Sequence, residues 1–396
     1  MRAAAATLAA LVAAPLAAQG AADPRYAGVI AETRQAILDS MAAHRIPGAQ
    51  IAVIRDGRLV WSEGFGLADV EQQVPVTPLT RFRIASISKA VTAVGLGLLV
   101  QEGRVDLDAP VQRYVPYFPV KPWPVTVRQV AGHIAGIRHY RPGEFESMKR
   151  YDTVREGVAI FADDSLLFEP GTRYSYSSYG WNLISAVIEG ASGEAFLAFM
   201  QRRVFGPMGM TRTVPEWPDS IIPWRARAYV HQDSLHPAQN APYVDNSYKW
   251  AGGGFLSTAE DLVRLGRNLL DGRLLSAATV ELLWTPQTLA DGSRTRYGIG
   301  WGSYVDDHGH RLAAHTGGAM GGTSHLVIFR DQRLVLALIV NSNETFIGAL
   351  PAFGLFCRHI RGLTLRGVRL SAASPDERPP LVVEDVEGLD GSVNTR

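Results

Sequence analysis

The chain has 396 residues, of which 46% are hydrophobic and 19% are charged, so it can bury a large core as one domain or two intertwined domains. Its 39 Lys and Arg nearly balance its 38 Asp and Glu, and no basic run is interleaved with aromatic residues. This balance argues against a nucleic-acid partner and favours a small-molecule or peptide substrate. The single cysteine, Cys357, excludes a disulfide framework and a cysteine-based zinc site.

Residues 1–22 have the layout of a secretory signal peptide. One arginine precedes an apolar stretch from Ala3 to Ala14, Pro15 interrupts it, and small residues follow. The apolar stretch is too short to cross a membrane. We therefore expect a secreted or periplasmic protein with no membrane span after cleavage, whose mature chain begins between Gln19 and Asp23. An alanine-rich first helix is the alternative interpretation.

Two β-hairpins are predicted near opposite ends of the chain. AQIAVIRDGRLVWSEGFG places two β-rich runs around the turn signal Asp56-Gly57, and the run from Ser324 to Asn343 repeats the pattern. Helical stretches lie between them, such as Leu183 to Glu189 and STAEDLVRLGRNLL, which opens on a Ser/Thr cap. The sequence therefore predicts an α+β fold. One antiparallel sheet is built from both chain ends, with flanking helices and a mostly helical insertion over roughly residues 106–289.

The end of the chain differs in composition from the rest. Residues 371–396 are rich in proline and acidic residues and show no clear period. Such a segment cannot bury enough apolar surface to order itself. We expect one domain over residues 23–370, followed by a poorly ordered tail.

The stretch RIASISKAVTAV carries a serine and a lysine one helical turn apart. Its apolar spacing predicts a helix after Thr80 that ends at Gly103, with Ser86 and Lys89 on one face near its start. Only four of the 39 basic residues are lysines. Arginine cannot give up its proton, whereas a desolvated lysine can become neutral and take the proton of a serine hydroxyl. Ser86 is the candidate nucleophile and Lys89 its candidate base, although the Ser-x-x-Lys spacing alone is a weak signal.

Two further segments carry matching chemistry in the expected order. EPGTRYSYSSYGWNLISAVIE places Tyr176 in a loop just before a helix, where a phenol can relay a proton to a leaving group. AAHTGGAMGGTSHLVIF opens a strand with small residues, against which a substrate can lie and where a backbone N–H can complete an oxyanion hole. The candidate residues of that strand are His315, Thr316, Gly317 and Gly318.

With these three segments the chain resembles the penicillin-recognising serine hydrolases, which include class C β-lactamases and D-Ala-D-Ala carboxypeptidases. The marks of that family are Ser-x-x-Lys, Tyr-x-Asn and Lys-Thr-Gly. GHIAGIRHY and APYVDNSYKWAGGGFLSTAEDL are similar to a peptidase-type branch with mitochondrial and bacterial members. The likeness runs from about Arg45 to Ser342 and implies a β-lactamase/DD-peptidase-like fold.

The resemblance also implies a role for each site residue. Ser86 is the acylated nucleophile, Lys89 its base and Tyr176 the proton relay. The backbone N–H groups of Ser86 and Gly318 form the oxyanion hole. No cofactor and no metal are expected.

Two positions depart from the family pattern. Ser178 stands where Tyr-x-Asn has its asparagine, and His315 stands where the third motif has a permanently charged lysine. These departures argue against efficient β-lactam hydrolysis and favour amide (peptide-type) substrates. Ester hydrolysis, weak β-lactamase activity, and a non-catalytic peptidoglycan-binding or oligomer-forming protein remain alternatives. If His315 receives a substrate carboxylate, that binding should weaken as the imidazole loses its charge near pH 6.5.

Several other residues have two interpretations. His308 and His310 form a possible metal pair, but their turn-like loop lacks an obvious third ligand and favours a surface turn. His133 and His139 either line the cleft or make structural hydrogen bonds. Residues 248–250 (Tyr-Lys-Trp) either border the substrate channel or pack within their loop.

Overall fold

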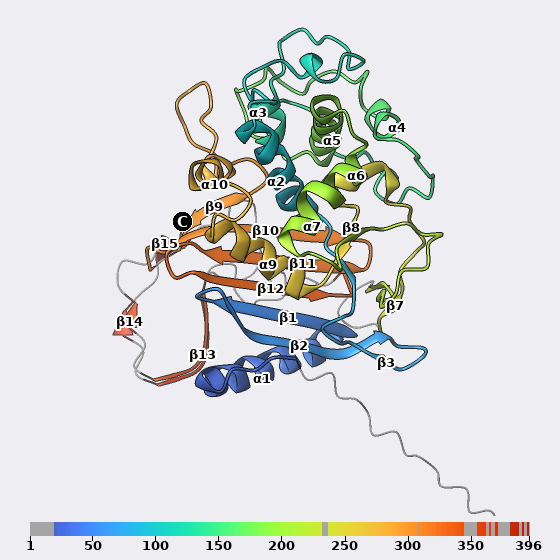
Figure 1. Cartoon of the computed structure of the whole chain (residues 1–396). Coiled ribbons are helices and arrows are strands. Elements are labelled where there is room, and N and C mark those ends of the chain that lie inside the picture. The colour runs from blue at the N-terminus through green and yellow to red at the C-terminus, as the bar shows by residue number, and fades with distance from the viewer. Residues whose placement is uncertain are drawn as a thin grey trace, which may run out of the picture. The chain divides into compact units, whose positions relative to one another are not determined.

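The structure, a computed structural model, describes residues 20–231, 237–306 and 308–343, and beyond them the backbone of six short strands between 355 and 395. The chain divides into two compact units, Met1–Asn343 and Glu344–Arg396. The first unit contains a seven-stranded antiparallel sheet in the order β3-β2-β1-β12-β11-β10-β9 (Figure 1). Its strands are β1 (Gly48–Arg55), β2 (Arg58–Asp69), β3 (Val74–Pro75), β9 (Gly302–Val305), β10 (Arg311–Ala319), β11 (Gly322–Phe329) and β12 (Leu334–Val340).

Strands from the two ends of the unit meet at the middle of this sheet. β1 pairs with β12 from Ala49 opposite Val340 to Arg55 opposite Leu334. The predicted sheet built from both chain ends is therefore confirmed. The predicted hairpins are also confirmed, as β1–β2 and β11–β12.

The first hairpin turns where the sequence places Asp56-Gly57. Both residues have positive φ, +50° and +75°. A two-residue turn with positive φ at both positions matches the right-handed twist of the flanking strands, and Asp-Gly adopts it readily. Turn chemistry therefore fixes which residues of the two strands face each other.

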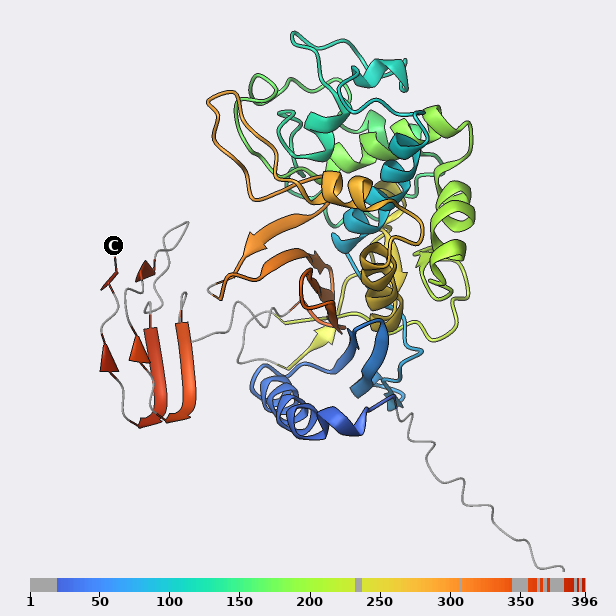
Figure 2. The same cartoon turned by 60° about the vertical axis from the view of Figure 1, so that its left-hand side comes forward.

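Helices cover both faces of the sheet. α1 (Ala27–Ala43) contributes to an apolar groove with Leu336 of β12, whereas the neighbouring Val335 faces α9 (Ala259–Leu270). Because successive strand residues point to opposite faces, α1 and α9 lie on opposite sides, as Figure 2 shows for the blue and gold helices. Thr258 caps α9 by accepting a hydrogen bond from the Asp261 N–H, which confirms the predicted Ser/Thr cap.

The remaining helices gather mainly between β4 and β9 of the chain. They are α2 (Ile87–Gln101), α3 (Val127–Ala131), α4 (Val154–Ala159), α5 (Ser178–Ser192), α6 (Phe196–Phe199), α7 (Gly206–Met208), α8 (Trp250–Gly253) and α10 (Ala277–Trp284). A small three-stranded sheet in the order β4-β8-β5 joins them, formed by β4 (Phe82–Arg83), β8 (Phe255–Ser257) and β5 (Val214–Pro215). A two-stranded ribbon completes this part with β6 (Tyr229–Val230) and β7 (Gln239–Asn240).

Helix α2 runs through the core. Every residue from Ile87 to Leu99 is buried, and Gly103, with φ +69°, lies just beyond its end. The predicted helix is confirmed, with Ser86 at its N-cap. A helix buried on all sides holds its first turn, and with it Ser86, rigidly.

In the described part of the second unit, the strands form parallel pairs. β13 (Leu355–Arg361) pairs with β16 (Leu381–Glu387). Two shorter pairs follow, β14 (Thr364–Leu365) with β17 (Asp390–Gly391) and β15 (Arg369–Leu370) with β18 (Asn394–Thr395). The sequence analysis did not predict strands within residues 371–396; the rest of that range, and residues 1–19 of the expected signal peptide, lie outside the described residues.

Among the described residues, no single helix has both the length and the apolar composition needed to cross a membrane. α5 and the segment Phe196–Met208, bent by 76° relative to each other, meet the length and composition criteria only as a pair.

Candidate active site

Ser86 sits at a strained entrance to α2. The preceding residue, Ala85, has φ +46°, a backbone conformation that costs a non-glycine residue about 1–3 kcal/mol and is concentrated at functional sites. Ser86 itself is helical, with φ −64° and ψ −10°. Within the described residues no hydrogen bond uses its backbone N–H, so this donor is available to a substrate oxygen.

Lys89 is fully buried beneath Ser86. Its Nζ lies 3.0 Å from Ser86 Oγ, 3.0 Å from Ser178 Oγ and 2.6 Å from the carbonyl oxygen of Gly252. Burial, helped by the nearby positive charge of Lys249, lowers the pKa of Lys89 well below its ordinary value. A neutral amine has two N–H donors and one lone pair.

The three oxygen partners of Lys89 can satisfy the two N–H donors and the one lone pair of a neutral amine. The Gly252 carbonyl can only accept, and Ser178 Oγ can accept the second N–H. The lone pair is then left for the hydroxyl hydrogen of Ser86. This arrangement directs the Lys89 lone pair toward Ser86 Oγ, the geometry that the predicted base requires, and it gives Ser178 a structural reason to carry a hydroxyl.

Tyr176 lies over the same two residues. Lys89 Nζ is 4.8 Å from the centre of its ring, and its phenol is within hydrogen-bonding reach of Ser86. Burial raises the Tyr176 pKa above its ordinary value, so the phenol keeps its proton and can donate it. The His133 ring packs 4.2 Å from the Tyr176 ring, centre to centre, and its Nδ1 accepts a hydrogen bond from the Ser177 N–H.

The third segment brings an open strand edge to Ser86. In the described sheet, β9 pairs with β10 only from Arg311 to Ala314. A Cβ at Gly317 would lie 2.3 Å from the Ile84 carbonyl oxygen, whereas one at Gly318 would meet nothing within 4 Å. Gly317 is therefore required for the close approach of β10 to the Ser86 turn, and Gly318 leaves room for a substrate.

A cavity of about 60 Å³ joins these groups. Its lining includes Ser86, Tyr176, Ser178, Lys249, Gly252 and Gly318. Residues from three separate stretches predicted by sequence therefore meet around one space. Thr316, the remaining strand candidate, is exposed.

His315 is buried beside this cavity and bonded within the protein. Its Nε2 lies 2.9 Å from the Tyr297 hydroxyl, and its Nδ1 lies 2.6 Å from the Thr316 carbonyl oxygen. Since a carbonyl only accepts, Nδ1 carries the hydrogen and Nε2 accepts from Tyr297. Burial lowers the His315 pKa to about 3. The neutral, fully bonded ring does not fit the expectation that His315 receives a substrate carboxylate.

We expect the free energy of unfolding to fall as the pH is lowered below about 6.5, and part of this loss should come from His315. Its folded-state pKa of about 3 lies below the ordinary 6.5, so between these values the unfolded chain binds one more proton. Stability from this group is complete above pH 6.5 and is lost as pH falls. The free energy of unfolding can be measured by urea unfolding at several pH values between about 4.5 and 6. Its change per pH unit should be smaller in His315→Gln than in the wild type, by up to about 1.4 kcal/mol per pH unit. Equal slopes would contradict a neutral His315.

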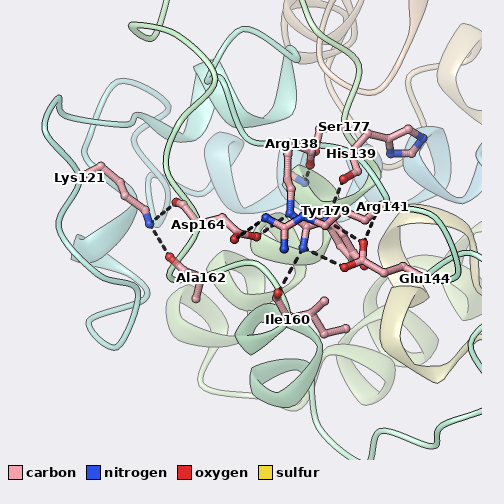
Figure 3. A network of polar contacts seen from close by, with 11 residues as sticks. Lys121, Arg138, His139, Arg141, Glu144, Ile160, Ala162, Asp164, Ser177 and Tyr179 are labelled. Carbon is pink, nitrogen blue, oxygen red and sulfur yellow. Dashed lines mark hydrogen bonds and ion pairs between the residues drawn. The ribbon is translucent and has the colours of Figure 1, made fainter.

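The loop that carries His139 is held by an ion-pair network around the buried Arg138 (Figure 3). Arg138 donates to Glu144 at 2.7 and 2.9 Å and to Asp164 at 2.5 Å, and Tyr179 donates to Glu144 at 2.9 Å. His139 Nδ1, 3.2 Å away, accepts from the Ser178 N–H. His133 and His139 therefore both make structural hydrogen bonds, and His139 also lines the cavity.

The structure distinguishes between the two interpretations of the other residues, 248–250 and the pair His308 and His310. Lys249 lines the cavity, whereas Tyr248 and Trp250 are buried by aromatic packing. His310 Nδ1 lies 2.8 Å from Asp306 Oδ2. No group of three or more candidate metal ligands occurs in the described part of the chain.

Sequence reasoning missed Arg138, Tyr297 and Gly252. Each acts through a contact with a residue far along the chain or through its backbone carbonyl, which leaves no motif of side chains. The segment GHIAGIRHY, already noted for its resemblance, was the one available signal for Arg138.

An antiparallel sheet closed by both chain ends, with a serine–lysine helix facing a tyrosine loop and an open strand edge, defines the class of β-lactamase-like proteins. The chain belongs to the beta-lactamase family, whose sequence model matches residues 33–350. It is 34% identical over 421 aligned positions to the mitochondrial serine beta-lactamase-like protein LACTB of Homo sapiens, covering 82% of this chain and 75% of that protein.

Two solved structures extend the likeness. One is the octameric penicillin-binding protein homologue from Pyrococcus abyssi, with a TM-score of 0.69, 27% identity, and coverage of 79% of this chain and 73% of that one. The other is a D-stereospecific amidohydrolase from Streptomyces sp., with a TM-score of 0.66, 28% identity, and coverage of 79% and 94%. The predicted family and fold are confirmed.

Proposed function

We propose that this chain is an exported serine hydrolase that cleaves amide bonds through an acyl-enzyme on Ser86. The observation that carries the proposal is the environment of Lys89, whose Nζ is buried, held by two oxygens and 3.0 Å from Ser86 Oγ. A buried lysine without a carboxylate partner is costly unless it becomes neutral. Its neutral form is the base that acylation requires.

In the acylation step, Ser86 Oγ attacks the substrate carbonyl carbon while its proton passes to Lys89 Nζ. The carbonyl oxygen becomes an oxyanion, which the N–H groups of Ser86 and Gly318 would stabilise. Collapse of the tetrahedral intermediate breaks the C–N bond. The departing amine takes a proton from the Tyr176 hydroxyl, which is resupplied from Lys89.

In the deacylation step, water attacks the Ser86 ester from the space that the amine leaves. The Tyr176 hydroxyl takes one proton from the water while it passes its own proton to Lys89 Nζ, and Lys89 gives a proton to Ser86 Oγ as the acid departs. The same two residues thus serve both halves of the cycle.

Amide substrates are favoured over β-lactams because Ser178 is committed to Lys89 and His315 is neutral and bonded to Tyr297. The likeness to a D-stereospecific amidohydrolase supports the same choice. An ester hydrolase or a weak β-lactamase is the alternative enzyme, and a non-catalytic peptidoglycan-binding or oligomer-forming protein is the alternative without chemistry.

A substrate panel tests the proposal. Purified protein is first labelled with a fluorophosphonate probe, and the labelled peptide is identified by mass spectrometry. Turnover of D- and L-amino acid amides, dipeptides, p-nitrophenyl esters and nitrocefin is then compared. Labelling at Ser86 with amide turnover supports the proposal. Labelling with ester turnover alone selects the esterase, and absence of labelling and turnover overturns the enzyme.

Export is the proposed location, based on the composition of residues 1–22. The Ser62 N–H donates to the Ala21 carbonyl oxygen at 2.8 Å, and the Asp23 N–H donates to the Val60 carbonyl oxygen at 2.8 Å. Retaining Ala21 keeps both hydrogen bonds to β2, so within the predicted range we expect the mature chain to begin at Gln19, Gly20 or Ala21. N-terminal sequencing of protein from the native cell tests this, and an intact Met1 would overturn it.

A further inference from the structure

The cavity beside Ser86 contains a second lysine that the proposed mechanism does not use. Lys249 ends the 3₁₀ turn η4 (Ser247–Lys249), directly before α8, and is only 4% exposed. Its side chain lines the same cavity as Ser86 and Gly318. Two of the four lysines of an arginine-rich chain therefore meet at one site.

Lys249 has no anionic partner inside the described part of the protein. Its Nζ lies 4.3 Å from the centre of the Phe145 ring, 5.0 Å from that of Tyr248 and 5.4 Å from that of Tyr140. These ring faces attract a cation but neutralise no charge. Within the described residues the Lys249 ammonium has no hydrogen bond or ion pair, and a cation on so little exposed a residue is unfavourable without an anionic partner.

Among the described residues, the other basic side chains near the cavity are already bonded within the protein or neutral. Lys89 is bound by Ser86, Ser178 and Gly252. Arg83 is paired with Glu216 at 2.9 Å, and Glu216 also accepts from Asn246 at 2.6 Å. His315 is neutral. In the part of the chain that the structure describes, Lys249 is thus the cation at this cavity that remains open to a substrate.

We propose that Lys249 is the specificity-determining residue of this site and binds a carboxylate carried by the substrate while Ser86 attacks the neighbouring carbonyl carbon. This inference rests on the proposed function, because it names the substrate class of that hydrolase. Under this proposal the substrate carboxylate is bound by Lys249, in the turn before α8, and not by His315 in the third motif. The carboxylate can be the C-terminal group of a peptide or an acidic side chain, since both present the same two oxygens.

The charge on Lys249 depends on pH. Burial and the positive charge of Arg83 lower the Lys249 pKa to about 7, while Glu216 and Glu146 act in the opposite direction. The remaining titratable groups that face it are His139, Lys89, Tyr140 and Tyr248. Carboxylate binding should therefore be strong below pH 7 and should weaken above it, as the ammonium loses its proton.

Binding measured in a Ser86→Ala background tests the inference without relying on turnover. Isothermal titration calorimetry at about pH 6 compares two pairs of ligands, each in D and L forms. One pair is N-acetyl-Ala-Ala with a free carboxylate against its carboxamide, and the other is N-acetyl-Asp amide against N-acetyl-Asn amide. We expect one acidic ligand to bind about 10- to 100-fold more tightly than its neutral partner, the range of a charged hydrogen bond. The pair that shows the preference identifies the source of the carboxylate.

Variants of Lys249 test whether this side chain causes the preference for the acidic ligand. In Lys249→Met, the acidic ligand and its neutral partner should bind with about equal affinity. In Lys249→Arg, the preference for the acidic ligand should persist at about pH 8.5, a pH at which the wild-type protein loses it. The matched control is Lys149→Met, which removes the same charge from an exposed position. Circular dichroism verifies that each variant is folded. No preference in either pair, or a preference that survives Lys249→Met, overturns the inference, whereas failure of Ser86 labelling overturns only the proposed hydrolase.

Discussion

Replacement of Ser86 by alanine is expected to abolish covalent labelling by a fluorophosphonate and to reduce amide turnover by roughly 10⁴-fold or more, the scale of nucleophile loss in serine hydrolases. The variant removes only the Oγ that lies 3.0 Å from Lys89 Nζ. The fold should be unaffected because Ser86 is a small N-cap residue without a capping hydrogen bond. Intact-mass spectrometry after labelling provides the measurement.

The control is Ser88→Ala, the other serine of the same turn. Two positions along a helix correspond to a rotation of about 200°, and Ser88 Oγ accepts a long 3.4 Å hydrogen bond from the Phe255 N–H instead of facing the cavity. Ser88→Ala should therefore label like the wild type, with a somewhat lower melting temperature because a buried N–H loses its acceptor. An adduct mapped to Ser88 would reject the assignment of the nucleophile.

Replacement of Lys89 by arginine or methionine should slow acylation by roughly 10²-fold or more, the usual loss when a general base is removed. Arginine keeps the positive charge but cannot lose its proton, and methionine keeps the length without an amine. In the wild type, acylation should accelerate as pH rises through the Lys89 pKa, which burial holds well below its ordinary value. Stopped-flow labelling across the pH range should show that rise disappear in both variants.

The arginine and methionine variants answer different questions. A Lys89→Arg protein that acylates nearly as fast as the wild type would reduce Lys89 to an electrostatic anchor. Methionine fills the buried space without an unpaired charge, so Lys89→Met remains informative where arginine fails to fold. Lys149→Arg, at an exposed position, serves as the control for substitution between the two basic residues.

Much of the fold could be predicted because its signals are local. Asp56-Gly57 determines a turn by the φ values its two residues adopt, and the apolar spacing after Thr80 determines a buried helix. The Ser86–Lys89 pair follows from that helix, since its two members are one turn apart. These inferences need no knowledge of distant residues.

The rest of the site depends on contacts between residues far apart in the chain. Lys89 reaches Gly252, 163 positions away, and the neutral state of His315 depends on Tyr297 and on burial. From sequence alone, His315 was therefore expected to bind a substrate carboxylate. For Lys249, packing within its loop and a place at the border of the substrate channel both stayed open. The rarity of lysine was a usable signal for Lys249, as it was for Lys89.

The pairing of β1 with β12 means that the sheet beside the site needs strands from both ends of the first unit. Ser86 is made early, but Gly318 follows 232 positions later, on a strand that needs β11 and β12 beside it. The first 300 residues contain Ser86 and Lys89 but not β10, the strand that carries Gly318. Contacts of such long sequence separation form late in folding. A chain that ends before β10 therefore lacks Gly318 and the strand edge beside Ser86.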